Sequence, residues 1–157
     1  MRKLAIVIFT FLILPLISYS QNFKEINGIS YDEEGNLLNG KYLNYNTKGE
    51  VEKIIYFKNG VKHGDYVEYY ADGKIKEHGH YADNVKHGKW VSWSEDGQKL
   101  GEIRYNQGLR DGKWQVWNKE GILKYVMYYD NGKKVGTWEM FDDEGILVQQ
   151  ENFGENF

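Results

Sequence analysis

From about residue 37 to its end, the chain alternates short runs of aromatic and aliphatic residues with polar clusters that contain glycine or asparagine. In residues 85–108, for example, the run KWVSW is followed by SEDGQ, then by KLGEIRY and NQG. Short aromatic and β-branched runs between glycine-containing clusters predict strands joined by tight turns. Strands connected in this way form a meander of antiparallel hairpins.

This pattern recurs every 24 residues without an insertion or deletion. The repeated glycines are Gly40, Gly64, Gly88, Gly112 and Gly136. The first aromatic column, two residues after each glycine, is Tyr42, Tyr66, Trp90, Trp114 and Trp138. The second aromatic column, five residues after it, is Tyr45, Tyr69, Trp93, Trp117 and Phe141. The third aromatic column, seventeen residues after it, is Phe57, Tyr81, Tyr105, Tyr129 and Phe153.

A fixed period of this kind is typical of repeat architectures. We therefore expect an all-β protein: an elongated, single-layer antiparallel β-meander of five units over residues 37–157, the last unit degenerate. Contacts between neighbouring units would supply most of the stability. An array of helices is the alternative, but each glycine inside a helix would cost about 1 kcal/mol. The glycines are expected to mark the turns, because glycine adopts positive φ without steric cost.

The two tryptophan positions of one unit are three residues apart, so Trp90 and Trp93 should point to opposite faces of a regular strand. Either both faces carry aromatic residues or a bulge rotates one of them. Val91 would share a face with Trp93, which favours Trp93 and Trp117 as packing residues. The candidate partner-binding residues are then the exposed members of the first column, namely Trp90, Trp114, Trp138 and Tyr66.

The first 20 residues differ from the rest of the chain. A basic start, an apolar run over residues 4–17 and the small residues before Gln21 predict a helical signal peptide, cleaved after Ser20. A membrane anchor is the alternative, but the apolar run is short for a bilayer span of about 20 residues. Residues 21–36 are expected to form an N-terminal cap or partial repeat, since Tyr31 and Gly35 keep the aromatic-to-glycine spacing of later units.

Charge excludes some classes of partner. The chain has 20 basic and 23 acidic side chains, a net charge of −3, and the charges are interspersed. The sequence offers no basic face for nucleic acid or anionic lipid. It contains no cysteine, so neither disulfides nor a lipid-modified cysteine is expected.

No catalytic or metal site is predicted. The four histidines, His63, His78, His80 and His87, show no convergent set of further ligands. Acidic pairs such as Glu95 and Asp96 fall at predicted turns, and no serine stands in a nucleophile elbow. We therefore expect a protein without enzymatic activity and without a cofactor.

The unit motif GKW..W..DG.......Y..G resembles the MORN repeat in its 24-residue variant form, found in bacterial YwqK-like proteins. The resemblance covers about residues 29–157. It implies the hairpin array predicted above. Members of this family are commonly described as antitoxin components, and MORN arrays elsewhere attach to proteins or membranes.

These observations predict an exported bacterial protein of the periplasm, the cell surface or the secreted fraction. We expect it to bind an unknown protein partner at the cell envelope, and a toxin is one candidate for that partner. Glycan binding through an exposed aromatic strip is the second hypothesis. Lipid attachment is the third, which the acidic balance disfavours, and cleavage would leave no stable membrane insertion.

Overall fold

The protein is described by a computed structural model that covers residues 23–154. This part of the chain consists of strands and turns, with no helix. The expected signal peptide lies outside the described residues. The strands are β1 (Lys24–Ile26), β2 (Ile29–Tyr31), β3 (Gly40–Tyr45), β4 (Val51–Lys58), β5 (Val61–Tyr69), β6 (Ile75–Ala82), β7 (Val85–Trp93), β8 (Lys99–Asn106), β9 (Leu109–Arg110), β10 (Gly112–Trp117), β11 (Leu123–Asp130), β12 (Lys133–Phe141) and β13 (Leu147–Asn152).

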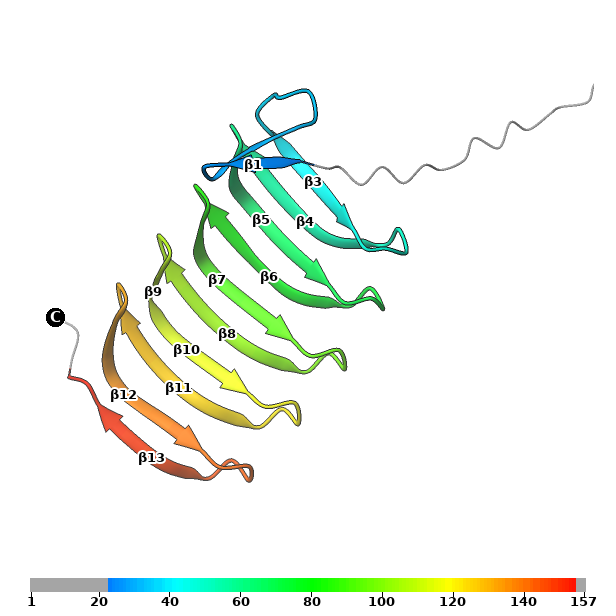
Figure 1. Ribbon diagram of the computed structural model, residues 1–157. Coiled ribbons are helices and arrows are strands. Elements are labelled where there is room, and N and C mark those ends of the chain that lie inside the picture. Colours follow the sequence, from blue (N-terminus) through cyan, green and yellow to red (C-terminus); the bar gives the residue numbers. More distant parts are fainter. Residues whose placement is uncertain (1–22, 155–157) are drawn as a thin grey trace, which may run out of the picture.

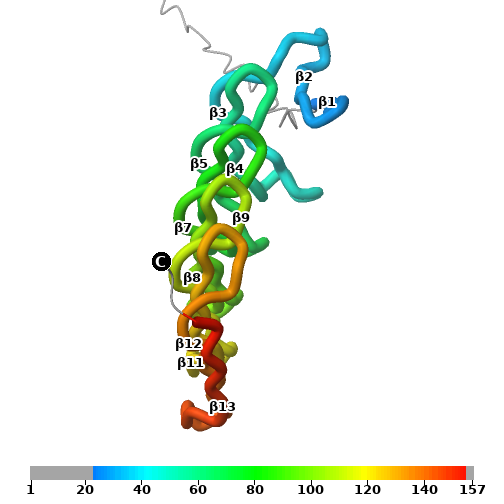
Figure 2. Tube along the Cα trace, turned by 90° about the vertical axis from the view of Figure 1, so that its left-hand side faces the viewer, coloured from blue at the N-terminus to red at the C-terminus, as the bar shows by residue number. Residues whose placement is uncertain are grey.

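Strands β3 to β13 form one antiparallel sheet in chain order, with the short β9 paired to β8 beside the main path. Each strand therefore pairs with its sequence neighbours, as in a meander (Figure 1). The sheet is long in the direction across its strands and only one layer thick (Figure 2). The predicted hairpin meander is confirmed.

Two kinds of turn connect the strands. At one long edge of the sheet, two-residue turns such as Asn59-Gly60 have positive φ at both residues, 50° and 77°. This conformation matches the twist of paired strands and selects asparagine and glycine. At the other edge, a polar residue opens a longer turn. The side chain of Asn46, for example, accepts hydrogen bonds from the amides of Lys48 and Glu50, at 2.9 and 3.1 Å.

The repeated glycine that opens each unit does not mark a turn, contrary to the sequence-based expectation. Gly64 lies inside β5, with a φ of 115°. Here the register shifts: Ile55 pairs with Tyr66, but Phe57 pairs with Lys62, so β5 carries extra residues in a bulge. A Cβ at Gly64 would lie 2.9 Å from Cβ of Tyr56, so a larger residue would be crowded as well as strained. The same shift recurs at Gly88 and Gly136.

The strand register places aromatic residues on both faces. Trp90 pairs with Ile103 and Trp93 with Lys99, and alternation along β7 points the two indoles to opposite faces. A bulge does occur next to Trp93, but the extra residue is Leu100 of the partner strand. We call the side of Trp90 the ladder face and the side of Trp93 the stripe face.

A two-stranded hairpin, β1 and β2, lies across the N-terminal end of the sheet (Figure 1). It brings Phe23 against Tyr42 and Phe57, with ring centroids 6.4 and 5.5 Å away. Ser30 of β2 and Leu38, which follows the hairpin in the chain, are each only 1% exposed. The amide of Ser30 donates to the carbonyl of Gly60 at 2.7 Å, which joins the hairpin to the first turn of the array.

Candidate functional site

The first and third aromatic columns interleave on the ladder face. Their rings, together with that of Phe23, form three runs of contacts with centroid distances of 4.9 to 6.4 Å. The runs comprise Phe23, Tyr42 and Phe57, then Tyr66, Tyr81 and Trp90, then Tyr105, Trp114, Tyr129, Trp138 and Phe153. Trp90 is completely buried and Trp114 is 8% exposed. We call this set the aromatic ladder.

Each tryptophan of the ladder also forms a hydrogen bond to the neighbouring strand. The indole nitrogen of Trp90 donates to the carbonyl of His80 at 3.1 Å, and those of Trp114 and Trp138 donate to equivalent carbonyls of the preceding units, both at 2.9 Å. Buried indoles need such a partner. Tyr66 takes this place in an earlier unit and instead donates its hydroxyl to Glu68 at 2.7 Å.

Basic side chains cover the ladder. Lys86 Nζ lies 3.7 Å from the ring centroid of Trp90, and it also lies over Tyr105. Arg110 and Lys134 stand over Trp114 and Trp138 in the same way, at 4.9 and 4.3 Å. A cation over an aromatic face is attractive and excludes water from the ring. Sequence reasoning missed this basic column, although residues 62, 86, 110 and 134 are all Lys or Arg at the repeat spacing.

Burial and hydrogen bonding shift the acidity of groups on the ladder face. Burial, aided by the hydrogen bond to Glu68, raises the pKa of Tyr66. Burial opposes ionisation of Glu68, but hydrogen bonds from Tyr66 and Lys76 outweigh it and hold the pKa of Glu68 below its ordinary value. Lys76 Nζ lies 3.0 Å from the Glu68 carboxylate. The carboxylate is therefore ionised at neutral pH and fixed in position.

The sequence-based expectation that Trp90 and Trp114 are exposed is wrong. Trp90 and Trp114, expected as exposed contacts, are buried, while Tyr66 and Trp138 are partly buried in the same ladder. The reason is that neighbours across strands, which a single strand's pattern does not contain, fill the ladder face. Trp93 and Trp117, expected to be packing residues, are only partly buried.

The second aromatic column forms a row along the stripe face. Each member stands directly opposite another side chain, mostly aliphatic. The pairs are Tyr45 with Val51, Tyr69 with Ile75, Trp93 with Lys99, Trp117 with Leu123 and Phe141 with Leu147. All five aromatic residues are partly buried, and Ile75 and Leu147 are 42% and 43% exposed. We call this row the aromatic stripe; its aromatic members recur every second strand, about 10 Å apart.

The stripe begins beside a hollow at the N-terminal end of the sheet. This open pocket has a volume of about 490 Å³. Leu43, Val51 and Ile54 give it an apolar lining, and the β5–β6 turn, residues 70–73, contributes to its wall. Tyr69 belongs to both the hollow and the stripe. The stripe face thus offers a row of accessible rings and a depression at one end of it.

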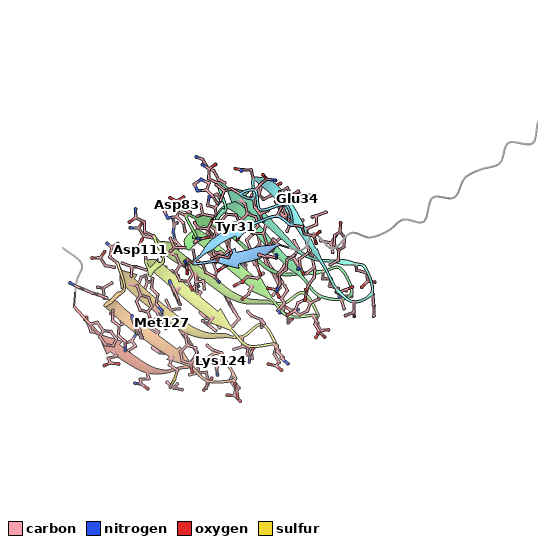
Figure 3. All side chains as sticks on the ribbon, turned by 45° about the horizontal axis from the view of Figure 1, so that its top comes forward. Tyr31, Glu34, Asp83, Asp111, Lys124 and Met127 are labelled. Atoms are coloured by element: carbon pink, nitrogen blue, oxygen red, sulfur yellow. The ribbon has the colours of Figure 1, made fainter. Side chains whose placement is uncertain are left out.

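Two of the histidines lie within hydrogen-bonding distance of carboxylates near the two-residue turns. His63 Nδ1 lies 3.1 Å from the Asp83 carboxylate, and His80 Nδ1 lies 3.4 Å from that of Asp65. In residues 23–154, no cluster of three metal-binding side chains is present. Figure 3 shows Asp83 and Asp111 near one edge of the sheet and Lys124 toward the other, without convergence on a common point.

No helix in the described part of the chain has the length and hydrophobicity needed to cross a membrane.

The fold and its two aromatic rows define a repeat protein built from one hairpin unit. The chain belongs to the MORN repeat variant family, whose model matches residues 62–83, 86–107, 110–131 and 134–154. No curated protein matches the sequence.

Parts of two solved structures are similar to the chain. A GtfA/B complex bound to UDP and GlcNAc matches 93% of this chain and 26% of its own, with 10% identity and a TM-score of 0.28. The accessory secretory protein 1, 2 and 3 structure from Streptococcus pneumoniae matches 85% of this chain and 21% of its own, with 15% identity and a TM-score of 0.22. The chain spans about a quarter of the length of these proteins or less, and similarity at this level carries no inference about function.

Proposed function

We propose that the protein is a non-catalytic binding module and that the aromatic stripe is the surface that contacts its protein partner. The observation that carries this proposal is the partial exposure of Trp93 and Trp117 on a face whose other side is already packed by the ladder. Aromatic side chains with one accessible side supply much of the binding energy in protein interfaces. The hollow beside Tyr69 would receive a protruding apolar side chain of the partner.

The stripe can be tested with two double variants. Trp93→Ala with Trp117→Ala removes the rings, whereas Trp93→Phe with Trp117→Phe keeps aromatic surface at the same positions. Tagged protein would be cross-linked in a bacterial host and purified with its bound partner. We expect the alanine variant to lose the partner and the phenylalanine variant to retain it. With the purified partner, affinity should fall by about 2 kcal/mol or more in the alanine variant.

Thermal melts of both variants separate a binding effect from unfolding. Equal recovery of the same partner by the native protein and a folded alanine variant would exclude the stripe as the contact surface.

A glycan is the second candidate ligand, because spaced accessible rings can also stack on sugars. Titration of soluble polysaccharides with tryptophan fluorescence distinguishes the two ligands. Quenching or a blue shift that disappears in the double alanine variant would favour a glycan.

We further propose that the protein acts outside the cytoplasm, at the bacterial envelope, and that its partner is a toxin that it neutralises. The apolar run before Ser20 supports export. The intact mass of protein recovered from the periplasm or medium should then begin at or near Gln21; full-length chain held in the inner membrane would contradict export. A toxin encoded by a neighbouring gene that binds the native chain but not the double alanine variant would support neutralisation.

A further inference from the structure

Strand β13, the last strand within residues 23–154, presents an open sheet edge in this part of the chain. All six residues of β13 are exposed, and β12 is its only partner within residues 23–154. Just before and within it, Ile146, Leu147 and Val148 are 62%, 43% and 52% exposed. Figure 1 shows β13 as the outermost strand, at the end opposite the β1–β2 hairpin.

Soluble proteins usually protect such an edge with lysine, proline or a covering segment. At the other end of the array, the β1–β2 hairpin packs Phe23 onto Tyr42 and Phe57. In β13 the sequence LVQQEN contains no lysine and no proline, and Glu151 is its only charged residue. The edge therefore favours pairing with another strand.

The hydrogen bonds to β12 show which groups of β13 are available. The amide of Phe153 donates to the carbonyl of Gly136 at 2.9 Å, so it points toward β12. Backbone groups alternate in direction along an antiparallel strand. The amides and carbonyls of Gln150 and Asn152 therefore point to the open edge.

We propose that β13 of one molecule pairs antiparallel with β13 of a second copy, in a two-fold dimer centred on Gln150. Residues directly opposite each other in a sheet lie on the same face. This condition permits a pairing in which Gln150 of one copy lies opposite Gln150 of the other. Gln149 of each copy then lies opposite Glu151 of the other. The outward backbone groups of the two Gln150 residues form the central hydrogen bonds. The carboxylate of Glu151 lies opposite the side-chain amide of Gln149 in the other copy.

The neighbouring registers are less favourable. A shift in one direction places Glu151 opposite Glu151, and directly opposed like charges destabilise a sheet. A shift in the other direction centres the pair on Gln149, whose backbone groups point toward β12, and places Gln150 opposite Val148, at the irregularity in the pairing of β13 with β12. A second copy satisfies the edge through a self-complementary register, as a two-fold interface requires.

The dimer can be trapped covalently, because the chain contains no cysteine. In a hydrogen-bonded antiparallel pair the Cα atoms are about 5.5 Å apart, and disulfides span roughly 4.4–6.8 Å between Cα atoms. We expect Gln150→Cys to form a disulfide dimer under mild oxidation. Glu144→Cys, in the exposed turn before β13, is the matched control and should remain largely monomeric. Equal cross-linking of the two variants, or none in Gln150→Cys, would overturn the proposal.

A second variant tests the backbone pairing without a covalent bond. Proline at position 150 removes an outward amide and leaves the ladder to β12 in place, because edge strands tolerate proline on the solvent side. Sedimentation should show a concentration-dependent dimer for the native chain and at least a tenfold weaker one for Gln150→Pro, with an unchanged melting temperature. A native chain that is monomeric at millimolar concentration would overturn the proposal. The double alanine variant of the stripe should still dimerise, which keeps this test separate from that of the proposed function.

Discussion

At the scale of single residues, Gly79 shows how closely the ladder packs. Gly79 lies in β6, directly opposite Tyr66, and the indole of Trp90 rests against it. A Cβ at this position would lie 2.1 Å from Cδ2 of Trp90. The sequence contains no sign of this contact, because Gly79 stands outside the repeated glycine positions and its neighbour across the sheet is known only from the register.

Gly79→Ala should therefore destabilise the protein by about 1–3 kcal/mol, the usual cost of overpacking a site without room. Gly101→Ala is a suitable control, because its φ is not positive and its Cβ would lie 3.0 Å from the Ser92 hydroxyl oxygen. Denaturant unfolding measures both changes. If Gly79→Ala costs no more than the control, Trp90 must have space to move.

The two tryptophans of the third unit, Trp90 and Trp93, differ in how deeply they are buried. Trp90 is completely buried, whereas Trp93 is partly exposed. We expect Trp90→Ala to lower the free energy of unfolding by about 3–5 kcal/mol and Trp93→Ala by less than half as much. Thermal and denaturant melts of the two variants measure this difference. Equal losses would mean that the aromatic stripe is as structural as the ladder.

Acid should remove the contribution of Glu68. Its pKa is lowered in the folded protein, so its stabilising effect is present above the unfolded pKa of about 4.3 and is lost as the pH falls through the lower folded value. At pH 7, Glu68→Gln should be less stable than the native protein by about 1 kcal/mol. At pH values below the lowered folded pKa of Glu68, the two proteins should converge. A difference that persists unchanged at low pH would assign the effect to packing and not to charge.

At the scale of the strand and hairpin, the sequence predicts much of the architecture because the turn chemistry is local. The turns at Asn59-Gly60 and Asn46 are determined by the conformational preferences and side-chain hydrogen bonds of their own residues. The 24-residue period indicates the order of the strands. The roles of Gly64 and Trp90 could not be predicted, because a bulge and a buried ring depend on the register with the neighbouring strand. The same holds for Lys86, whose contact with Trp90 requires the two side chains to meet around the bulge at Gly88.

Removal of one complete unit should preserve the sheet. Deletion of residues 85–108 takes out β7 and β8 and joins Asn84 to Leu109, which corresponds to Val85 in the repeat. We expect a folded, shorter array with a similar circular dichroism spectrum per residue, because each unit contacts only its neighbours. Deletion of residues 85–96 removes β7 alone and reverses the direction of every later strand, so it should abolish a cooperative melt. Similar melts for the two deletions would contradict this modular account.

At the scale of the whole molecule, the two ends of the sheet are unequal. The N-terminal end carries the β1–β2 hairpin, whose Glu25 lies 3.8 Å from Lys62. At the C-terminal end β13 has an open edge in the described part of the chain. The two faces are unequal as well, since the ladder contains the buried rings of Trp90 and Trp114 under basic side chains, while every ring of the stripe is partly exposed. The two ends of the sheet therefore differ from each other, and so do its two faces.

The strands run across the long axis of the molecule, and this has a mechanical consequence (Figure 1). A force that pulls the two ends of the array apart along that axis acts along the hydrogen bonds between strands. Such a load falls on one strand pair after another and not on the whole sheet at once. The array should therefore lengthen under tension by peeling strands from an end, each step at low force, and shorten again when the load is released.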